Sequence, residues 1–353
     1  MEILSQRTLS KIAVSAAIYR TPAIDAKVAT KYFWVKSDNN HKVEVTDMQT
    51  HRFSISINCD LSSTVDISGK THLSEEIYKD NGFIILPDNY TTSGTPTRLV
   101  INCHGAGGTV TTDDSQAEHQ TLTQYLVANG YAVMDVNGLP LEYAEKNGID
   151  IRNNIGSPLA IQSYIKAYTY CIENFNLYRE VFVHGGSMGG ISSTNLVLCG
   201  QIPVIAHSAF CPVLDTYNEI FLHPWSGGLP KTALGKIYGL DKDANGDYIY
   251  NEEKVMGFNP MKNPKAERYP VPVKFWHCED DEVVSVSITR KFIDRIIANN
   301  GEAYLRTFPH GGHEPQLAGE YIENPCGNII FNGTELKITP AVEEAFYWIK
   351  QFD

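Results

Sequence analysis

The stretch from Arg179 to Gly190, REVFVHGGSMGG, limits the folds open to this chain more than any other segment. Its apolar start, Val181 to Val183, is short and β-branched, as a buried parallel strand should be. The G-x-S-x-G turn that follows would hold Ser187 at the tip of a sharp strand-to-helix connection. Glycines on both sides remove Cβ atoms that would collide with the neighbouring strand and helix. A glycine-rich connection in an ordinary α/β sheet could look the same, so the turn needs partners elsewhere in the chain.

A helix is expected to follow this turn, from about Met188 to Leu198. Its first amides would point at the place where an attack by Ser187 turns a carbonyl into an oxyanion. A serine hydroxyl is a weak nucleophile, so it also needs a base to take its proton and a carboxylate to orient that base. The turn therefore predicts an acid and a histidine on loops that follow later strands.

From about Tyr78 onward, strands and helices alternate along the chain. This alternation predicts an α/β fold, with a mostly parallel sheet and helices on both of its faces. Functional residues in such a sheet are expected at the carboxyl ends of the strands. Later strands are expected at 98–103, 131–136, 204–210, 271–276 and 303–308, and helices at 120–129, 158–175, 288–299 and 340–352.

Two of these strands end in loops that carry the required side chains. The strand at 271–276 runs into HCEDDEVV, and the strand at 303–308 runs into PHGGHE. A further glycine-rich turn, HGAGG, follows the strand at 98–103. The order along the chain is therefore serine, acid, histidine.

The elbow HGGSMGG, the turn HGAGG, the loop HCEDDEVV and the terminal GGHE together resemble the α/β-hydrolase superfamily. The resemblance is to prolyl-oligopeptidase-like peptidases and to feruloyl or acetylxylan esterases, and it covers about 78–353. It implies the α/β-hydrolase fold, with Ser187 as the nucleophile, Asp281 as the acid and His313 as the base.

The same resemblance implies an oxyanion hole with one amide from Met188 and a second from Ala106 or Gly105. A glycine-rich turn can bring its amides close to a developing negative charge, and one such donor is worth about 3 kcal/mol of barrier. His104 is expected to brace that turn, and His184 to pack within its strand.

Neighbouring side chains offer alternatives for the acid and the base. Asp280 or Glu279 could orient the base instead, and the acidic cluster could also be a solvated loop. His310 could replace the base, although the proline before it restrains the chain. His277 beside a cysteine suggests a metal site, but a second ligand group at helix or hairpin spacing is missing.

The irregular segment at about 212–269 is expected to be a lid insertion. Within it, DKDANGDYIYNE at 241–252 matches the calcium-loop pattern D-x-[DN]-x-[DN]-G-x5-E at every specified position. The match predicts a structural Ca²⁺ site, against the alternative of a solvated turn, and catalysis itself is expected to need no cofactor. The loop departs from paired EF-hands because it has no partner loop. The predicted ligands are Asp241, Asp243, Asn245, Asp247 and Glu252.

Residues 1–75 differ from the rest, with alternating runs at 32–35, 42–45 and 53–57 that suggest short half-exposed strands. They predict a β-rich N-terminal extension or accessory module ahead of a catalytic domain at 76–353. An N-terminal strand pair that covers one edge of the main sheet is an equal alternative.

The formal net charge of −12 is spread along the chain without a basic cluster, which argues against nucleic acid and anionic membranes as partners. No apolar run approaches the length of a membrane span, and the first thirty residues lack a convincing export signal. The seven cysteines include no C-x-x-C pair. A cytoplasmic location is favoured, an extracellular or particle-associated one stays open, and the oligomeric state is open.

The leading functional hypothesis is a metal-independent serine esterase that works through an acyl-enzyme. The resemblance suggests small-molecule or glycan esters, such as acetyl or feruloyl esters of carbohydrates. The first alternative is a serine peptidase of the prolyl-oligopeptidase type, although such enzymes carry a propeller that about 75 residues cannot form. The second is an assembly or surface-binding protein in which the N-terminal segment docks to a partner and the hydrolase is accessory.

Overall fold

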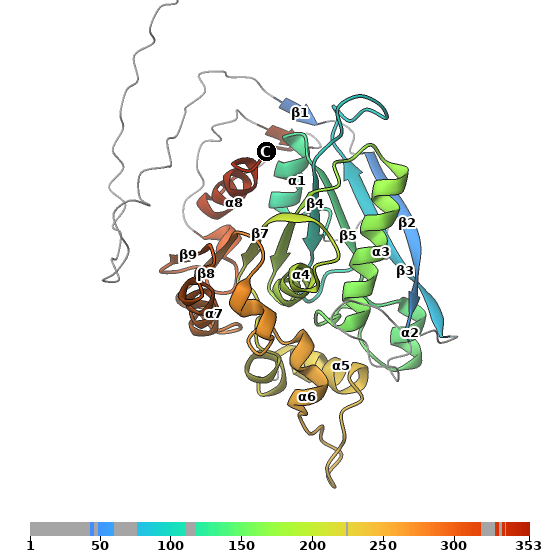
Figure 1. Ribbon diagram of the computed structural model, residues 1–353, viewed down its shortest axis with the longest axis vertical. Helices are drawn as coiled ribbons and strands as arrows, with labels where there is room; N and C mark the ends of the chain where they lie inside the picture. Colours follow the sequence, from blue (N-terminus) through green and yellow to red (C-terminus); the bar gives the residue numbers. More distant parts are fainter. Residues whose placement is uncertain are drawn as a thin grey trace, which may run out of the picture. The chain divides into compact units, whose positions relative to one another are not determined.

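Eight strands form one sheet at the centre of the compact unit Asn39–Asp353 (Figure 1). Their spatial order is β2-β3-β5-β4-β6-β7-β8-β9, and the six strands from β5 to β9 run parallel. The pairs β2–β3 and β3–β5 are antiparallel. The bounds are β2 (Gln49–Asn58), β3 (Ile77–Leu86), β4 (Leu99–Cys103), β5 (Ala132–Val136), β6 (Val181–Gly186), β7 (Val204–Phe210), β8 (Val273–Cys278) and β9 (Ala303–Phe308).

This computed structural model describes residues 43–45, 49–59, 76–110, 117–223, 225–318, 329–331, 334–335 and 337–353. The strand expected at 32–35 lies outside these ranges.

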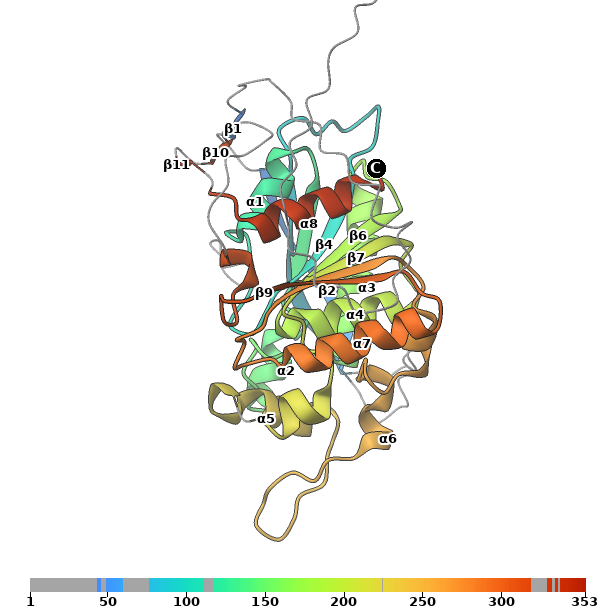
Figure 2. The same ribbon diagram turned by 90° about the vertical axis from the view of Figure 1, so that its left-hand side faces the viewer.

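Helices cover both faces of the sheet, as predicted (Figure 2). One face packs against α2, α3, α4 and α7, and the other against α1 and α8. Within β4, Leu99 and Ile101 pack into the core on the α3 and α4 side, and Val100 packs into the core on the α1 and α8 side. Both faces of the strand are therefore buried. The bounds are α1 (Thr121–Ala128), α2 (Leu141–Lys146), α3 (Pro158–Asn174), α4 (Met188–Cys199), α7 (Val286–Ala298) and α8 (Pro340–Lys350).

Two of the covering helices begin at a strong local start signal. The Ser157 side chain accepts a hydrogen bond from the amide of Ala160, and a proline occupies the first turn of α3. Thr339 caps α8 in the same way, again before a proline. Among the helices of the described ranges, none combines the length and apolar character that crossing a bilayer requires.

Part of the expected N-terminal extension belongs to the main sheet. β2 pairs with β3 over its full ten residues, and its buried Phe53, Ile55 and Ile57 alternate with exposed serines. β2 is therefore an edge strand that contributes to the core. A separate small sheet joins β1 (Val43–Val45), β10 (Ile329–Phe331) and β11 (Thr334–Glu335).

The segment between β7 and β8 is an insertion of short helices that lies beyond the layer of α4 and α7 (Figure 2). Asn195 Nδ2 of α4 donates to the carbonyl of Phe258 at 2.8 Å, which ties the insertion to that layer. Lys236 Nζ donates to the carbonyl of Gly148 at 2.7 Å. The main elements of the insertion are a π-helix (Thr216–Phe221), α5 (Leu229–Ile237) and α6 (Glu252–Val255).

Candidate active site

The backbone at Ser187 is held in a strained conformation by close packing around it. Ser187 has φ +53° and ψ −120°, at the junction of β6 and α4. A Cβ added to Gly189 would lie 1.8 Å from the carbonyl oxygen of Cys103, and one added to Gly185 would lie 2.4 Å from the carbonyl oxygen of Gly189. The elbow can therefore form only because these two positions lack side chains.

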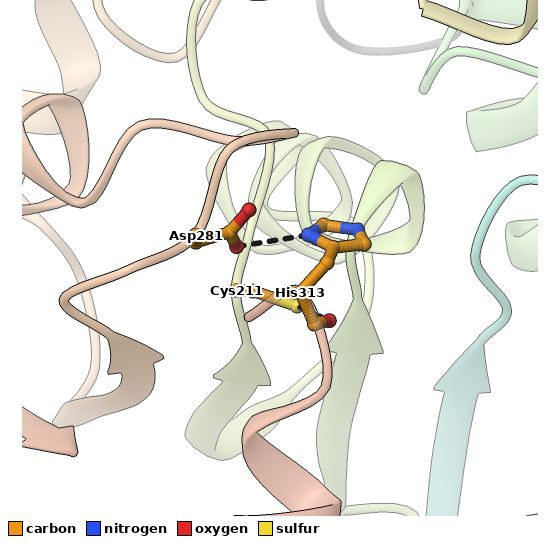
Figure 3. A group of neighbouring side chains, drawn as sticks. All are labelled: Cys211, Asp281 and His313. Atoms are coloured by element: carbon orange, nitrogen blue, oxygen red, sulfur yellow. Dashed lines mark hydrogen bonds and ion pairs between the residues drawn. The ribbon is translucent and has the colours of Figure 1, made fainter. Parts of the chain in front are cut away.

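The three residues predicted to form a triad are brought together by loops at the carboxyl ends of β6, β8 and β9. His313 Nε2 lies 2.7 Å from Ser187 Oγ, and His313 Nδ1 lies 2.8 Å from Asp281 Oδ2. Figure 3 shows the carboxylate of Asp281 facing the imidazole. The spacing permits proton transfer from the hydroxyl to the ring without movement of either loop.

Asp281 is buried, and hydrogen-bond donors keep it ionised. Its Oδ1 accepts the amides of Val283 at 2.8 Å and Val284 at 2.9 Å. Its Oδ2 accepts from His313 and also from His277 Nε2, at 3.0 Å. Burial alone would raise the pKa of Asp281, but the hydrogen bonds from the two histidines outweigh it and hold the pKa well below its usual range. The site thus has a fixed negative charge behind the imidazole.

His277 is the residue of this network whose role the sequence did not reveal. Its Nε2 lies 3.0 Å from both Asp281 Oδ2 and the Val284 carbonyl, so Nε2 carries the proton and donates. Its Nδ1 lies 3.0 Å from Thr289 Oγ1 and accepts from that hydroxyl. Both ring nitrogens are thereby engaged without a metal. Its place at the end of β8 gave no signal of these partners, because the contacts form only when the loop after the strand folds back onto it.

The alternative acid and base lie apart from Ser187. Asp280 Oδ1 accepts the amide of Gly312 at 2.8 Å, and Asp280 Oδ2 faces His310 at 3.4 Å. Glu279 forms an ion pair with Arg290. These contacts stabilise the loops that carry the triad.

The residues predicted to form the oxyanion hole lie next to Ser187 in the structure. The Met188 amide opens α4, where a first-turn N–H has no acceptor within its own helix. A Cβ on Gly105 would lie 3.4 Å from Ser187 Cβ, and Ala106 lines the same pocket. His104 Nδ1 donates to the Gly105 carbonyl at 2.9 Å, so this histidine does brace the turn.

A pocket of about 330 Å³ opens in front of Ser187. None of the described residues that line this pocket comes from the segment 212–269, so a lid role for that insertion stays a prediction. The start of that segment contacts the elbow, because the amide of Val213 donates to the Ser187 carbonyl at 2.9 Å. The lining residues are Gly105, Ala106, Gly108, His119, Gln120, Thr121, Leu122, His184, Gly186, Ser187, Phe210, Cys211, His313, Glu314, Gln316 and Leu317.

His184 is buried within β6 and forms one wall of this pocket. Its Nδ1 lies 2.8 Å from Ser208 Oγ, and burial lowers the pKa of His184 to about 3. It is therefore a neutral strand residue, in keeping with the packing role predicted for it.

Cys211, Asp281 and His313 offer ligand atoms that all lie within 4.8 Å of one another (Figure 3). Cys211 Sγ donates to the His313 carbonyl at 3.2 Å. Burial, then the charges of Asp281 and Glu314, raise the pKa of the Cys211 thiol well above its usual value. The thiol is thus a protonated donor that holds the histidine loop, which is the opposite of the thiolate a metal needs.

The calcium-loop sequence forms an exposed turn whose charged ends face lysines. Asp243 Oδ1 accepts the amides of two following loop residues, and Asp241 lies 3.9 Å from the ammonium of a lysine. Glu252 lies 3.5 Å from another lysine. In this arrangement the carboxylates do not converge, so the residues as placed do not fit a Ca²⁺ ion. Calcium binding by this loop stays a prediction.

No family model matches the chain, and no curated protein is similar to it in sequence. Solved structures share its fold at low identity. An acylaminoacyl peptidase in complex with Z-Gly-Gly-Phe-chloromethyl ketone has a TM-score of 0.55 and 14% identity, over 77% of this chain and 39% of that one. A putative dipeptidyl aminopeptidase IV from Bacteroides ovatus has a TM-score of 0.55 and 16% identity, over 86% of this chain and 36% of that one.

The acylaminoacyl peptidase of Pyrococcus horikoshii gives a TM-score of 0.55 and 12% identity, over 87% of this chain and 42% of that one. The chain thus spans about two fifths of the length of these structures. At such identities the likeness establishes the α/β-hydrolase fold. All three structures are peptidases by name, and none of them is an esterase.

Substituting alanine for Gly189 is expected to destabilise the protein by about 3 kcal/mol, since the added methyl group would overlap a strand carbonyl that has no room to move. Chemical denaturation of the purified protein measures this. Gly186→Ala is the matched control, because a Cβ at Gly186 meets nothing within 4 Å. Equal stability of the two variants would contradict the packing argument.

Glu219 in the π-helix should make stability depend on pH. Burial raises its pKa to about 8, although its Oε2 accepts the amides of Leu214 and Asp215. A raised carboxyl pKa means that the fold favours the protonated form. Its contribution is therefore complete below about pH 4.5 and is lost as the pH rises through 8, at about 1.4 kcal/mol per unit of pKa difference.

Melting temperature should thus fall between pH 5 and pH 9 by more in the native protein than in Glu219→Gln, where the side chain cannot ionise. Glu253→Gln alters an exposed glutamate of the same insertion and serves as control. Parallel melting curves for the native protein and Glu219→Gln would refute the assignment.

Proposed function

We propose that this chain is a serine hydrolase that cleaves acyl bonds through an acyl-enzyme on Ser187, and that its substrates are amides of the peptide or acyl-amino type. The observation that carries the proposal is the hydrogen-bonded chain from Ser187 through His313 to Asp281, with distances of 2.7 and 2.8 Å. It lies on an elbow whose strained backbone exposes the hydroxyl to the pocket.

Each residue has a defined part in the reaction. His313 Nε2 takes the Ser187 proton as the oxygen attacks the carbonyl carbon, and the amides of Met188 and Ala106 receive the resulting oxyanion. The ionised Asp281 stabilises the imidazolium. His313 then gives the proton to the leaving nitrogen, which departs as an amine. Water, deprotonated by the same ring, adds to the acyl-enzyme, and the acid leaves as the proton returns to Ser187.

Two lines of support rank the substrate classes. The fold is similar to structures named acylaminoacyl peptidase and dipeptidyl aminopeptidase, which favours amide bonds over the carbohydrate esters expected first. A carboxylic ester is the second candidate, because the HGAGG and HGGSMGG motifs also resemble those of esterases. The triad chemistry applies to both bonds.

Labelling with a fluorophosphonate probe tests the nucleophile. The native protein should label at one serine, and Ser187→Ala should lose labelling together with about a thousandfold or more of its hydrolytic rate. Ser285→Ala, which alters an exposed serine, should behave like the native protein. A panel of acyl-aminoacyl anilides, aminoacyl anilides, p-nitrophenyl acetate and acetylated xylan then ranks the substrates. Labelling that survives in Ser187→Ala would exclude this serine as the nucleophile.

A further inference from the structure

We propose that the pocket in front of Ser187 selects substrates that carry a positively charged group, which the carboxylate of Glu314 receives. The proposal rests on the proposed function, since it names the substrate class of the same site. The expected substrates are amides or esters with an ammonium group on a short apolar body, such as a free amino terminus or a lysine side chain.

The described side chains that line the pocket carry a negative charge and no lysine or arginine to balance it. Apart from histidines and the protonated Cys211 thiol, Glu314 is the one ionisable side chain among the described residues that line it. Glu314 is exposed, and the side-chain amide of Gln316 donates to its carboxylate without neutralising it. An anionic group with no lining cation favours a cationic ligand.

The backbone holds this carboxylate close to the reacting atoms. Glu314 directly follows His313, its amide donates to the Gly311 carbonyl at 3.2 Å, and its own carbonyl accepts the Leu317 amide at 2.8 Å. These hydrogen bonds hold the backbone of the turn that carries the Glu314 side chain. The Cys211 thiol, which lines the same pocket, donates to the His313 carbonyl at 3.2 Å and so holds this turn from the other side.

Two features of the pocket oppose a cation. The N-termini of α1, at Gln120 and Thr121, and of α4, at Ser187, both lie at the pocket and present the positive ends of their helix dipoles. Each end amounts to about half of one elementary charge, against the full charges of the Glu314 carboxylate and of the ionised Asp281 behind His313. The carboxylates therefore determine the sign. Leu122, Phe210 and Leu317 supply apolar surface for the body that carries the cation.

Two substrate pairs that differ in charge but little in shape test the proposal. Acetylthiocholine is compared with neohexyl thioacetate for a cation on the leaving group, and lysine p-nitroanilide with norleucine p-nitroanilide for a cation on the acyl group. In the native protein kcat/KM should favour the charged member of at least one pair. Glu314→Gln should reduce that preference about two- to fivefold, as expected for an exposed ion pair. Addition of about 1 M NaCl should reduce it as well.

Glu282→Gln is the matched control, because it removes an exposed carboxylate beside Asp281 that does not line the pocket. Protection of Ser187 from fluorophosphonate labelling gives a second measurement that needs no turnover, and choline should protect better than neohexyl alcohol. No charge preference in either measurement, or equal preference in Glu314→Gln and the native protein, would overturn the proposal. Failure of Ser187 to label at all would instead overturn the proposed function.

The hydrogen bonds around Asp281 carry a second, independent inference. The geometry points to His277 as a positioning residue that acts on the reaction through Asp281. Its ring is fully buried, and it donates to Asp281 Oδ2, the same oxygen that receives His313. Thr289 fixes the tautomer by donating to the other ring nitrogen. Two imidazoles therefore share one carboxylate oxygen, and Thr289 holds one of them in place.

Loss of this donor should change the reaction more than the binding. His277→Leu should lower kcat about tenfold or more with little change in KM, which is the value of one hydrogen bond to a charged group. The carboxylate would then attract the proton of His313 more strongly, so the acid limb of the pH profile should move to higher pH.

His277→Gln keeps an N–H donor near the position of Nε2 and should restore most of kcat and the pH profile. Thr289→Val keeps the ring but removes the bond that fixes its tautomer, and should give a smaller change in the same direction. Melting curves check that each variant folds. A folded His277→Leu protein with native kcat and pH profile, or no rescue by glutamine, would refute the role.

Discussion

The close approach of helix α4 to strand β4 is the constraint on which the rest of this structure depends. At Gly189 the helix backbone lies so near the Cys103 carbonyl that a Cβ would stand 1.8 Å from it. Because the helix starts this close to the sheet, Ser187, which precedes it, turns with a positive φ, and this half-buried serine lines the pocket at the strand ends. The same contact sets β4 beside β6, so the HGAGG turn reaches the elbow. The contact between α4 and β4 thus places both the predicted nucleophile and the predicted oxyanion amides.

The second requirement of the site is a buried carboxylate that stays ionised at a small cost in free energy, and Asp281 meets it. An isolated carboxylate in such a place would take up a proton, because burial favours its neutral form. Asp281 instead accepts four hydrogen bonds, from two backbone amides and two imidazoles. The amides belong to its own loop, so folding of that loop already provides two of the four hydrogen bonds. The other two come from His277 at the end of β8 and from His313 after β9, which joins two loops into one rigid unit.

The sequence predicted those parts of the site that depend on local backbone rules. Glycines flanking a serine after an apolar strand specify the elbow, and strand-end loops specify where the acid and base lie. Tertiary contacts between residues far apart in the chain could not be predicted from the sequence. The strand expected at 271–276 extends to Cys278, so His277 is a buried strand residue whose partners no spacing rule reveals. The placement of the insertion at 212–269 also depends on tertiary contacts, such as the hydrogen bond from Asn195 to the Phe258 carbonyl. Likewise, β2 joins the sheet through pairing with β3, which alternation alone does not specify.

The charge of the pocket interacts with the reaction in a way that depends on its stage. The ground-state carbonyl is neutral, so Glu314 affects it little. In the proposed reaction a negative charge develops on the carbonyl oxygen during attack, in front of the predicted oxyanion donors Met188 and Ala106 and within the same pocket as Glu314. The carboxylate then opposes the oxyanion unless a cation lies between them. A substrate ammonium group would supply that cation, and its benefit would be largest when the oxyanion exists. Such an interaction is stronger in the transition state than in the ground state, so it raises kcat rather than merely lowering KM.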